Sequence, residues 1–229
     1  MLYLYALLSR KPREITGAGI RGELLRVLPC GSLVAAVSDV SGAPPLQEWS
    51  IREHEQTVRR LAESVDAILP ARFGSVIPDE HVLVQLVESR EAELRQALEL
   101  VEGREQMTLR VYGEASPVPE LPVEIEAEEG GVLGPGARYL ARKMGARARE
   151  QLVTELESVR PQLAPLVRAE RIQRHSTPPL IASVYHLIER GQSTRYLEVL
   201  NGNAHGDPPV RIIASGPWPP YAFARWEWL

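Results

Sequence analysis

The chain has 229 residues, of which 44% are hydrophobic and 24% are charged, and its formal net charge at pH 7 is −4. These are the proportions of a globular protein, and the length suffices for one large domain or two smaller ones. The acidic balance argues against a nucleic-acid or anionic-membrane partner, because phosphate binding needs clustered positive charge.

Cysteine use and hydropathy exclude further classes of protein. The single cysteine, Cys30, cannot form an internal disulfide or a cysteine-based metal site, and it fits a reducing cytoplasm. The apolar residues 2–8 follow no basic residue and include tyrosines, so a signal peptide is not expected. No apolar run approaches the roughly 20 residues that a membrane span needs.

The chain opens with three predicted strands. Residues 2–8 are apolar throughout and predict a buried strand, and residues 23–28 and 32–38 predict two more. Pro29 is expected to close the second strand, because proline cannot donate a hydrogen bond to a sheet. The glycine-rich residues 17–22 match a dinucleotide-binding pattern by letter, but no crossover helix fits before residue 33, so a loop is expected.

Two helices are predicted next. Ser50, with Glu53 three residues later, predicts a capping box at the start of the first helix, and Pro70 marks its end. Asp79 is the expected cap of a second helix that stops at Gly103. The first helix is expected to bury one apolar stripe, formed by Val58, Leu61, Val65 and Ile68.

The second half predicts the order strand, helices, strand, strand, helix, strand, which is the ferredoxin-like order. An acidic loop at residues 114–136 follows the first of these strands, and Pro161 and Pro165 break the helical stretch into shorter pieces. The strands are expected at residues 107–112, 171–176, 180–188 and 210–215, and the last helix at residues 193–200.

We therefore predict an α+β protein with two domains and a tail. Residues 1–104 form a mixed α+β domain, and residues 105–223 form a ferredoxin-like domain with a helical insertion. Residues 224–229 form an aromatic tail that packs between the domains, because exposed tryptophans would be a costly patch. The alternative for these tryptophans is an assembly surface, where aromatic anchors dominate the binding energy.

Neither a metal site, a cofactor site nor an active site is predicted. The serines lack a nucleophile elbow, Cys30 lacks a clear activating neighbour, and Glu126, Glu128 and Glu129 fall in the glycine-rich loop. No two histidines have the i, i+4 spacing of a zinc site on a helix, and solvated or helix-end roles are expected for His54 and His81. The five are His54, His81, His175, His186 and His205.

Residues 216–223 read Gly-Pro-Trp-Pro-Pro-Tyr-Ala-Phe and follow the last predicted strand. Three prolines in four positions predict a stiff, extended segment that cannot continue a sheet interior. Such a segment, with its aromatic rings, suits a clamp between two parts of the chain or a docking site for a partner. The residues concerned are Gly216, Pro217, Trp218, Pro219, Pro220, Tyr221 and Phe223.

Residues 69–76 read Leu-Pro-Ala-Arg-Phe-Gly-Ser-Val and form a second motif. One interpretation is a contact patch that presents Arg72. The other is a turn in which Phe73 fills the core and Gly74 supplies an unusual φ. We favour the turn for Phe73 and Gly74 and leave both interpretations open for Arg72.

These two motifs, with the opening Leu2-Tyr3-Leu4-Tyr5-Ala6, resemble the gas vesicle protein F/L family in order and over nearly the whole chain. The resemblance implies an N-terminal α+β domain and a modified ferredoxin-like C-terminal domain. It also implies a cytoplasmic structural or assembly accessory protein of gas vesicles, which give cells buoyancy, rather than an enzyme. The implied partners are the small hydrophobic shell protein and other gas vesicle accessory proteins.

Two other functional classes stay open on the residues themselves. A ferredoxin-like small-molecule or nucleic-acid binding module predicts a basic or ligand-lined sheet face. A hydrolase or transferase predicts a pocket with converging titratable groups, and the sequence displays none. The sequence does not predict an oligomeric state.

Overall fold

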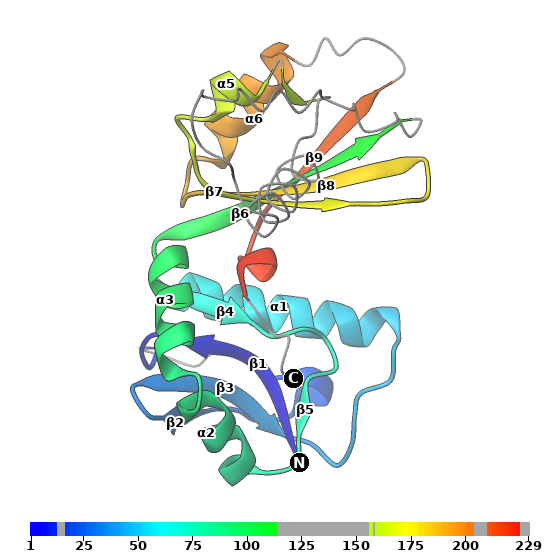
Figure 1. Cartoon of the computed structure of the whole chain (residues 1–229). Helices are drawn as coiled ribbons and strands as arrows, with labels where there is room; N and C mark the ends of the chain where they lie inside the picture. Colours follow the sequence, from blue (N-terminus) through cyan, green and yellow to red (C-terminus); the bar gives the residue numbers. More distant parts are fainter. Residues whose placement is uncertain (13–16, 114–155, 158, 204–209, 225–229) are drawn as a thin grey trace, which may run out of the picture.

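A computed structural model describes residues 1–12, 17–113, 156–157, 159–203 and 210–224 of the chain. The predictions for the acidic loop, for Glu126, Glu128 and Glu129, for His205 and for the tail beyond residue 224 lie outside these residues. The described part is an α+β protein with two antiparallel sheets, one from each half of the chain (Figure 1).

The N-terminal sheet is organised around its first strand. The order is β2-β3-β1-β4, every pair is antiparallel, and β5 also pairs with β1. The strands are β1 (Leu2–Leu8), β2 (Leu25–Cys30), β3 (Leu33–Asp39), β4 (Ile68–Pro70) and β5 (Val76–Ile77). The short helix η1 (Ile20–Gly22) lies between β1 and β2 in the chain.

Helices cover both faces of this sheet. Tyr3 and Leu8 of β1 share a core with Val58 of α1 (Glu48–Ser64). Leu4 on the other face shares a core with Leu83 of α2 (Glu80–Glu88) and with α3 (Glu91–Val101). This explains why β1 is buried along its whole length and why its sequence lacks polar alternation.

The C-terminal sheet has the order β7-β8-β6-β9, with all neighbours antiparallel. Its first strand in the chain therefore lies between the third and the fourth, which confirms the ferredoxin-like prediction. The strands are β6 (Arg104–Tyr112), β7 (Val167–Arg174), β8 (Leu180–Glu189) and β9 (Arg211–Trp218). Helices α5 (Arg160–Leu163) and α6 (Ser193–Asn203) lie on one face (Figure 1).

The start and end of α1 differ from the prediction. Gln47 is the N-cap, and Ser50 occupies the third helical position, where its hydroxyl accepts the Gln47 backbone N–H at 3.3 Å. The helix ends at Ser64, and Ile68 with Pro70 belongs to β4. Strand pairing with β1 outcompetes the apolar helical spacing here, and Pro70 is tolerated because β4 is an edge strand.

Two further predictions need correction. Pro29 does not close the second strand but lies inside β2, which is the other edge of the sheet. The helix predicted from Asp79 to Gly103 is two helices, α2 and α3, with a break after Glu88. The capping role of Asp79 is confirmed, because its side chain accepts the Val82 backbone N–H at 2.9 Å.

Candidate functional site

Residues 69–76 leave β4, turn, and enter β5. Ala71 is fully buried, and Arg72 is exposed. Phe73 is half-buried, with its ring centroid 6.4 Å from that of Tyr3 and 5.9 Å from that of His54. Gly74 has a φ of +91°, a conformation that glycine adopts without strain. The turn interpretation therefore describes Phe73 and Gly74, and the Arg72 side chain is left at the surface.

A buried histidine holds this turn in place. His54 of α1 is only 3% exposed, and its Nε2 lies 3.1 Å from the Ala71 carbonyl oxygen. A carbonyl only accepts, so Nε2 carries the proton and Nδ1 accepts from the Tyr3 hydroxyl at 2.9 Å. That hydroxyl in turn accepts the Gly74 backbone N–H at 3.1 Å. The network joins α1, β1 and the turn.

The solvated or helix-end role predicted for His54 is wrong. Burial lowers the pKa of His54 from its usual 6.5 to about 4, so the ring is neutral at pH 7. The sequence did contain a signal for this burial. His54 lies four residues before Val58 and seven before Leu61, which places it on the same apolar stripe of α1. His81, by contrast, is exposed.

The proline-rich block begins inside the C-terminal sheet. Strand β9 continues through Trp218, which pairs with Gln106 of β6, so the last strand extends beyond the predicted residues 210–215. The block can stay in the sheet because β9 is an edge strand, where Pro217 need not donate a ladder hydrogen bond.

The rest of the block passes between the two sheets as a short segment, residues 219–224, which we call the wedge. It contains the helix η3 (Tyr221–Phe223), which lies between the sheets in Figure 1. The Ala222 N–H donates to Gln106 Oε1 at 2.8 Å, and Arg171 of β7 donates to the Ala222 carbonyl at 2.5 Å. The wedge is thus held by side chains of the C-terminal sheet.

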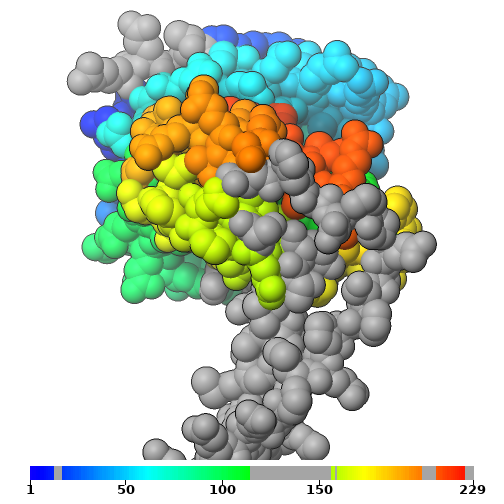
Figure 2. Space-filling view, turned by 90° about the horizontal axis from the view of Figure 1, so that it is seen from above, coloured from blue at the N-terminus to red at the C-terminus, as the bar shows by residue number. Residues whose placement is uncertain are grey.

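The side chains of the wedge point into the N-terminal half. Phe223 is 1% exposed and belongs to the core shared by β1, β4, α2 and α3, which also contains Leu187 of β8. Pro219 and Pro220 are buried, and Tyr221 packs beside the α1 core. In Figure 2 the wedge is visible only as a small red area beside α1 and α6. The block therefore fits the clamp interpretation.

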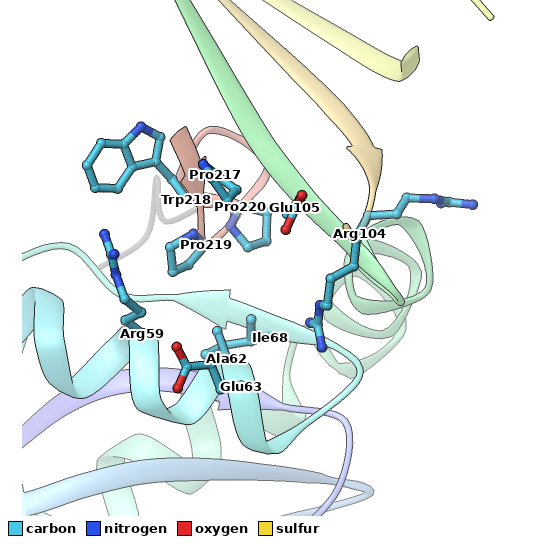
Figure 3. A pocket seen from close by; sticks show the side chains of 11 residues that line it. Arg59, Ala62, Glu63, Ile68, Arg104, Glu105, Pro217, Trp218, Pro219 and Pro220 are labelled. Atoms are coloured by element: carbon cyan, nitrogen blue, oxygen red, sulfur yellow. The ribbon is translucent and has the colours of Figure 1, made fainter. Parts of the chain in front are cut away.

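Trp218 lies at the mouth of a groove between the two halves. The Arg59 guanidinium of α1 lies 5.2 Å from the centroid of its ring, and Figure 3 shows the two side chains next to each other. The groove encloses about 180 Å³. Burial raises the pKa of Glu105 on its wall, and the carboxylate accepts the Gly191 N–H at 3.1 Å. Its other walls include Ala62, Glu63, Ile68, Arg104, Arg190 and Pro217 to Pro220.

The structure thus brings the two motifs together. β4 of the first motif contacts η3 of the second, and Ile68 lines the same groove as Trp218. Phe73 and Tyr221 both pack against the core under α1. Most residues of the two motifs lie in this internal junction, whereas the side chains of Arg72, Pro217 and Trp218 keep part of their surface in solvent.

Gly216→Ala is expected to destabilise the chain by about 2 kcal/mol or more. Gly216 has a φ of +128°, and a Cβ atom there would lie 2.8 Å from the Gln106 carbonyl oxygen. Urea denaturation measures the loss. Gly74→Ala is the matched control, because Gly74 also has a positive φ but nothing lies within 4 Å of the added atom. Equal losses in the two variants would contradict the close approach.

His175, His186 and Cys30 lie outside the two motifs. His175 Nε2 bonds with Ser183 Oγ at 2.9 Å, and His186 bonds with Tyr196 and with Glu170. Burial raises the pKa of the Cys30 thiol to about 11. Within the described ranges, no three His, Cys, Asp or Glu residues converge as a metal site. None of the helices described here combines enough length and apolar composition to traverse a bilayer.

The fold and the site together define an α+β protein with two antiparallel sheets, joined by a junction that both motifs build. The chain belongs to the GvpL/GvpF family of gas vesicle synthesis proteins, whose family model matches residues 1–225. This is a family of gas vesicle proteins and not a known family of enzymes.

Relatives and solved structures agree with this assignment. The chain is 27% identical to gas vesicle protein L of Streptomyces sp. (strain CB03234), over 90% of this chain and 85% of the relative. It is 23% identical to gas vesicle protein F of the same strain, over 93% of each. Crystal structures of GvpF from Anabaena sp. PCC7120 and from Microcystis aeruginosa each match the fold with a TM-score of 0.72. They are 18% and 20% identical, over 98% of this chain and 95% and 98% of theirs.

Proposed function

We propose that this chain is an accessory protein of gas vesicle assembly that binds the small hydrophobic shell protein and other gas vesicle proteins while the shell forms. The observation that carries the proposal is an exposed apolar segment, residues 46–51, at the start of α1. Leu46 is 80% exposed, Trp49 42% and Ile51 40%. A partner with apolar surface would remove these side chains from water, which is the main driving force of such contacts.

The segment is held in one conformation before any partner binds. The Ser50 hydroxyl donates to the Pro45 carbonyl at 2.5 Å, and the Gln47 and Ser50 side chains cap the start of α1. The indole N–H of Trp49 already has an acceptor in the Gln47 side chain, so the exposed ring needs no polar partner. A pre-ordered apolar anchor loses little conformational entropy on binding.

In this proposal the motifs at residues 69–76 and 216–223 mainly hold the two halves of the chain together, whereas residues 46–51 bind the shell protein. Residues 1–104 and 105–223 act as two domains, and the wedge fixes their relative orientation. Phe223 anchors the wedge in the first domain, and Gln106 and Arg171 hold it to the second. Arg72 and Trp218, which keep surface in solvent, are then the motif side chains available to other gas vesicle proteins.

A Leu46→Ser, Trp49→Ser double variant is expected to lose shell-protein binding by about tenfold or more, because a buried aromatic anchor carries a large share of binding energy. The assay co-expresses the tagged chain with the shell protein of its own gene set and measures the shell protein retained after purification. A Glu48→Gln, Arg52→Gln variant is the control, because it removes an exposed ion pair on the same helical turns. Undiminished retention by the double variant would sink the assignment of residues 46–51.

A further inference from the structure

The C-terminal sheet has one face packed on helices and one face turned away from them. Met107 and Leu109 of β6, with Val184 of β8 and Ile212 of β9, pack under α5 and α6. Neighbouring residues of a strand point to opposite faces. The other face, which we call the open face, therefore carries Arg110, Tyr112, Arg171, Gln173, Ser183, Tyr185, Arg211 and Ile213. Its middle is covered, because Ser183 is buried and Tyr185 packs against the core that contains Phe223, whereas Arg110, Arg211 and Ile213 are exposed.

The charge on this open face has one sign. The four stretches that form it, residues 106–112, 169–175, 181–187 and 211–217, contain a single carboxylate, that of Glu170. Glu170 lies on the helix side, where it accepts from His186 at 2.8 Å and pairs with Arg160 at 3.3 Å. A chain with a net charge of −4 thus has a sheet face on which the charged side chains are arginines.

The three arginines of the open face differ in their contacts. Arg171 is engaged with the wedge, through the Ala222 carbonyl and the Phe223 ring. Arg110 and Arg211 are both exposed, and among the described residues neither is in a salt bridge. Ile213 pairs with Arg110 across β6 and β9 and is itself 37% exposed. Within the described ranges, this end of the face thus presents two cations beside an apolar side chain with no carboxylate paired to them.

The register sets the spacing of the two cations. Arg110 pairs with Ile213 and Tyr112 pairs with Arg211, so Arg211 is the diagonal neighbour of Arg110. Diagonal neighbours on adjacent strands lie roughly 7–8 Å apart. In an extended peptide, side chains two residues apart are separated by about 6.6 Å and point the same way. Acidic residues at alternate positions of an extended segment match this spacing.

We propose that the open face binds an extended acidic segment of a partner protein, with the carboxylates of alternate residues on Arg110 and Arg211 and the methylene stems of these residues against Ile213. The observations favour a protein segment over a single-stranded nucleic acid. Nucleic-acid sites cluster positive charge along the backbone of the ligand, whereas this chain has a net charge of −4 and this end of the described face presents two exposed arginines, Arg110 and Arg211. This inference does not rest on the proposed function, because it concerns a different surface and a different class of ligand.

The test uses the full chain and a fluorescein-labelled peptide with glutamate at every second position and leucine or serine between. Fluorescence anisotropy at about 50 mM salt should reveal binding that weakens as salt rises, because the contacts are between exposed charges. Arg110→Gln, Arg211→Gln should weaken the affinity about tenfold. Arg52→Gln, Arg95→Gln is the matched control, since it removes two exposed arginines from α1 and α3 and should leave the affinity unchanged.

Each outcome decides for or against the open face. Circular dichroism of both double variants checks that the exposed substitutions leave the fold intact. Absence of binding by the wild-type chain would overturn the proposal, as would equal affinities in the two double variants. Tighter binding of a labelled oligothymidine of equal charge would assign the face to nucleic acid instead. None of these results involves the shell protein, so failure here is distinguishable from failure of the proposed function.

Discussion

Phe223→Ala is expected to lower the free energy of unfolding by about 3–5 kcal/mol, the range for removing a fully buried phenylalanine ring. The ring is 1% exposed in the core of β1, β4, α2 and α3, while the backbone of its segment is held by Gln106 and Arg171. The variant therefore loses core packing in one half and loosens the attachment of the other. Urea denaturation followed by circular dichroism measures the loss.

Phe73→Ala is the matched control, because the chain has only two phenylalanines and Phe73 is half-buried. Its expected loss is smaller, about 1–2 kcal/mol, in proportion to the area that it buries. If Phe223→Ala cost less than Phe73→Ala, the wedge would not be an anchor between the two halves. A loss confined to one of two separate unfolding transitions would also contradict the coupling that we assign to it.

Acid is expected to destabilise the protein through His54. The folded-state pKa of His54 is about 4, and the usual value is 6.5. Between these two pH values the unfolded chain binds a proton that the folded chain does not. The stability that neutral His54 contributes is therefore complete above pH 6.5 and is lost as the pH falls toward 4. The expected loss is about 2 kcal/mol between pH 7 and pH 5 and about 3 kcal/mol by pH 4.

The pH effect has its own controls. His54→Gln removes the titrating group, so the difference in unfolding free energy between pH 7 and pH 5 should shrink by about 2 kcal/mol relative to the wild-type chain. His81→Gln changes an exposed histidine and should leave the difference as it is. If His54→Gln kept the full pH dependence, the neutral, buried state of His54 would be wrong.

The sequence predicted those elements whose signals are local. The apolar run of β1, the cap at Asp79 and the strand β8 follow from residue type and spacing alone, and the structure has all three. The order of the second-half elements was also enough to predict the ferredoxin-like sheet. The errors arose where tertiary context decides. The spacing of Ile68 continues the apolar stripe of the helix in the sequence, but its backbone pairs with β1 and Ile68 therefore belongs to β4.

The junction was harder to predict than the elements that form it. Proline chemistry indicated that residues 216–223 could not lie in a sheet interior, but it could not show that β9 would be an edge strand. A lone histidine on an amphipathic helix does not reveal its partners, because Tyr3, Ala71 and Gly74 are distant in sequence. The exposure of Leu46 and Trp49 likewise depends on where the rest of the chain packs.

Complementation tests the central claim, that this chain takes part in gas vesicle assembly through an exposed apolar surface. In a host with a working gas vesicle gene set, the gene for the host's member of this family is deleted. The host then receives the gene for this chain and the gene for the shell protein from the same gene set as this chain. The readout is light scattering that collapses under pressure. We expect the wild-type chain to restore it and the Leu46→Ser, Trp49→Ser variant to fail. A folded wild-type chain that restores nothing, or a variant that restores everything, would contradict the claim.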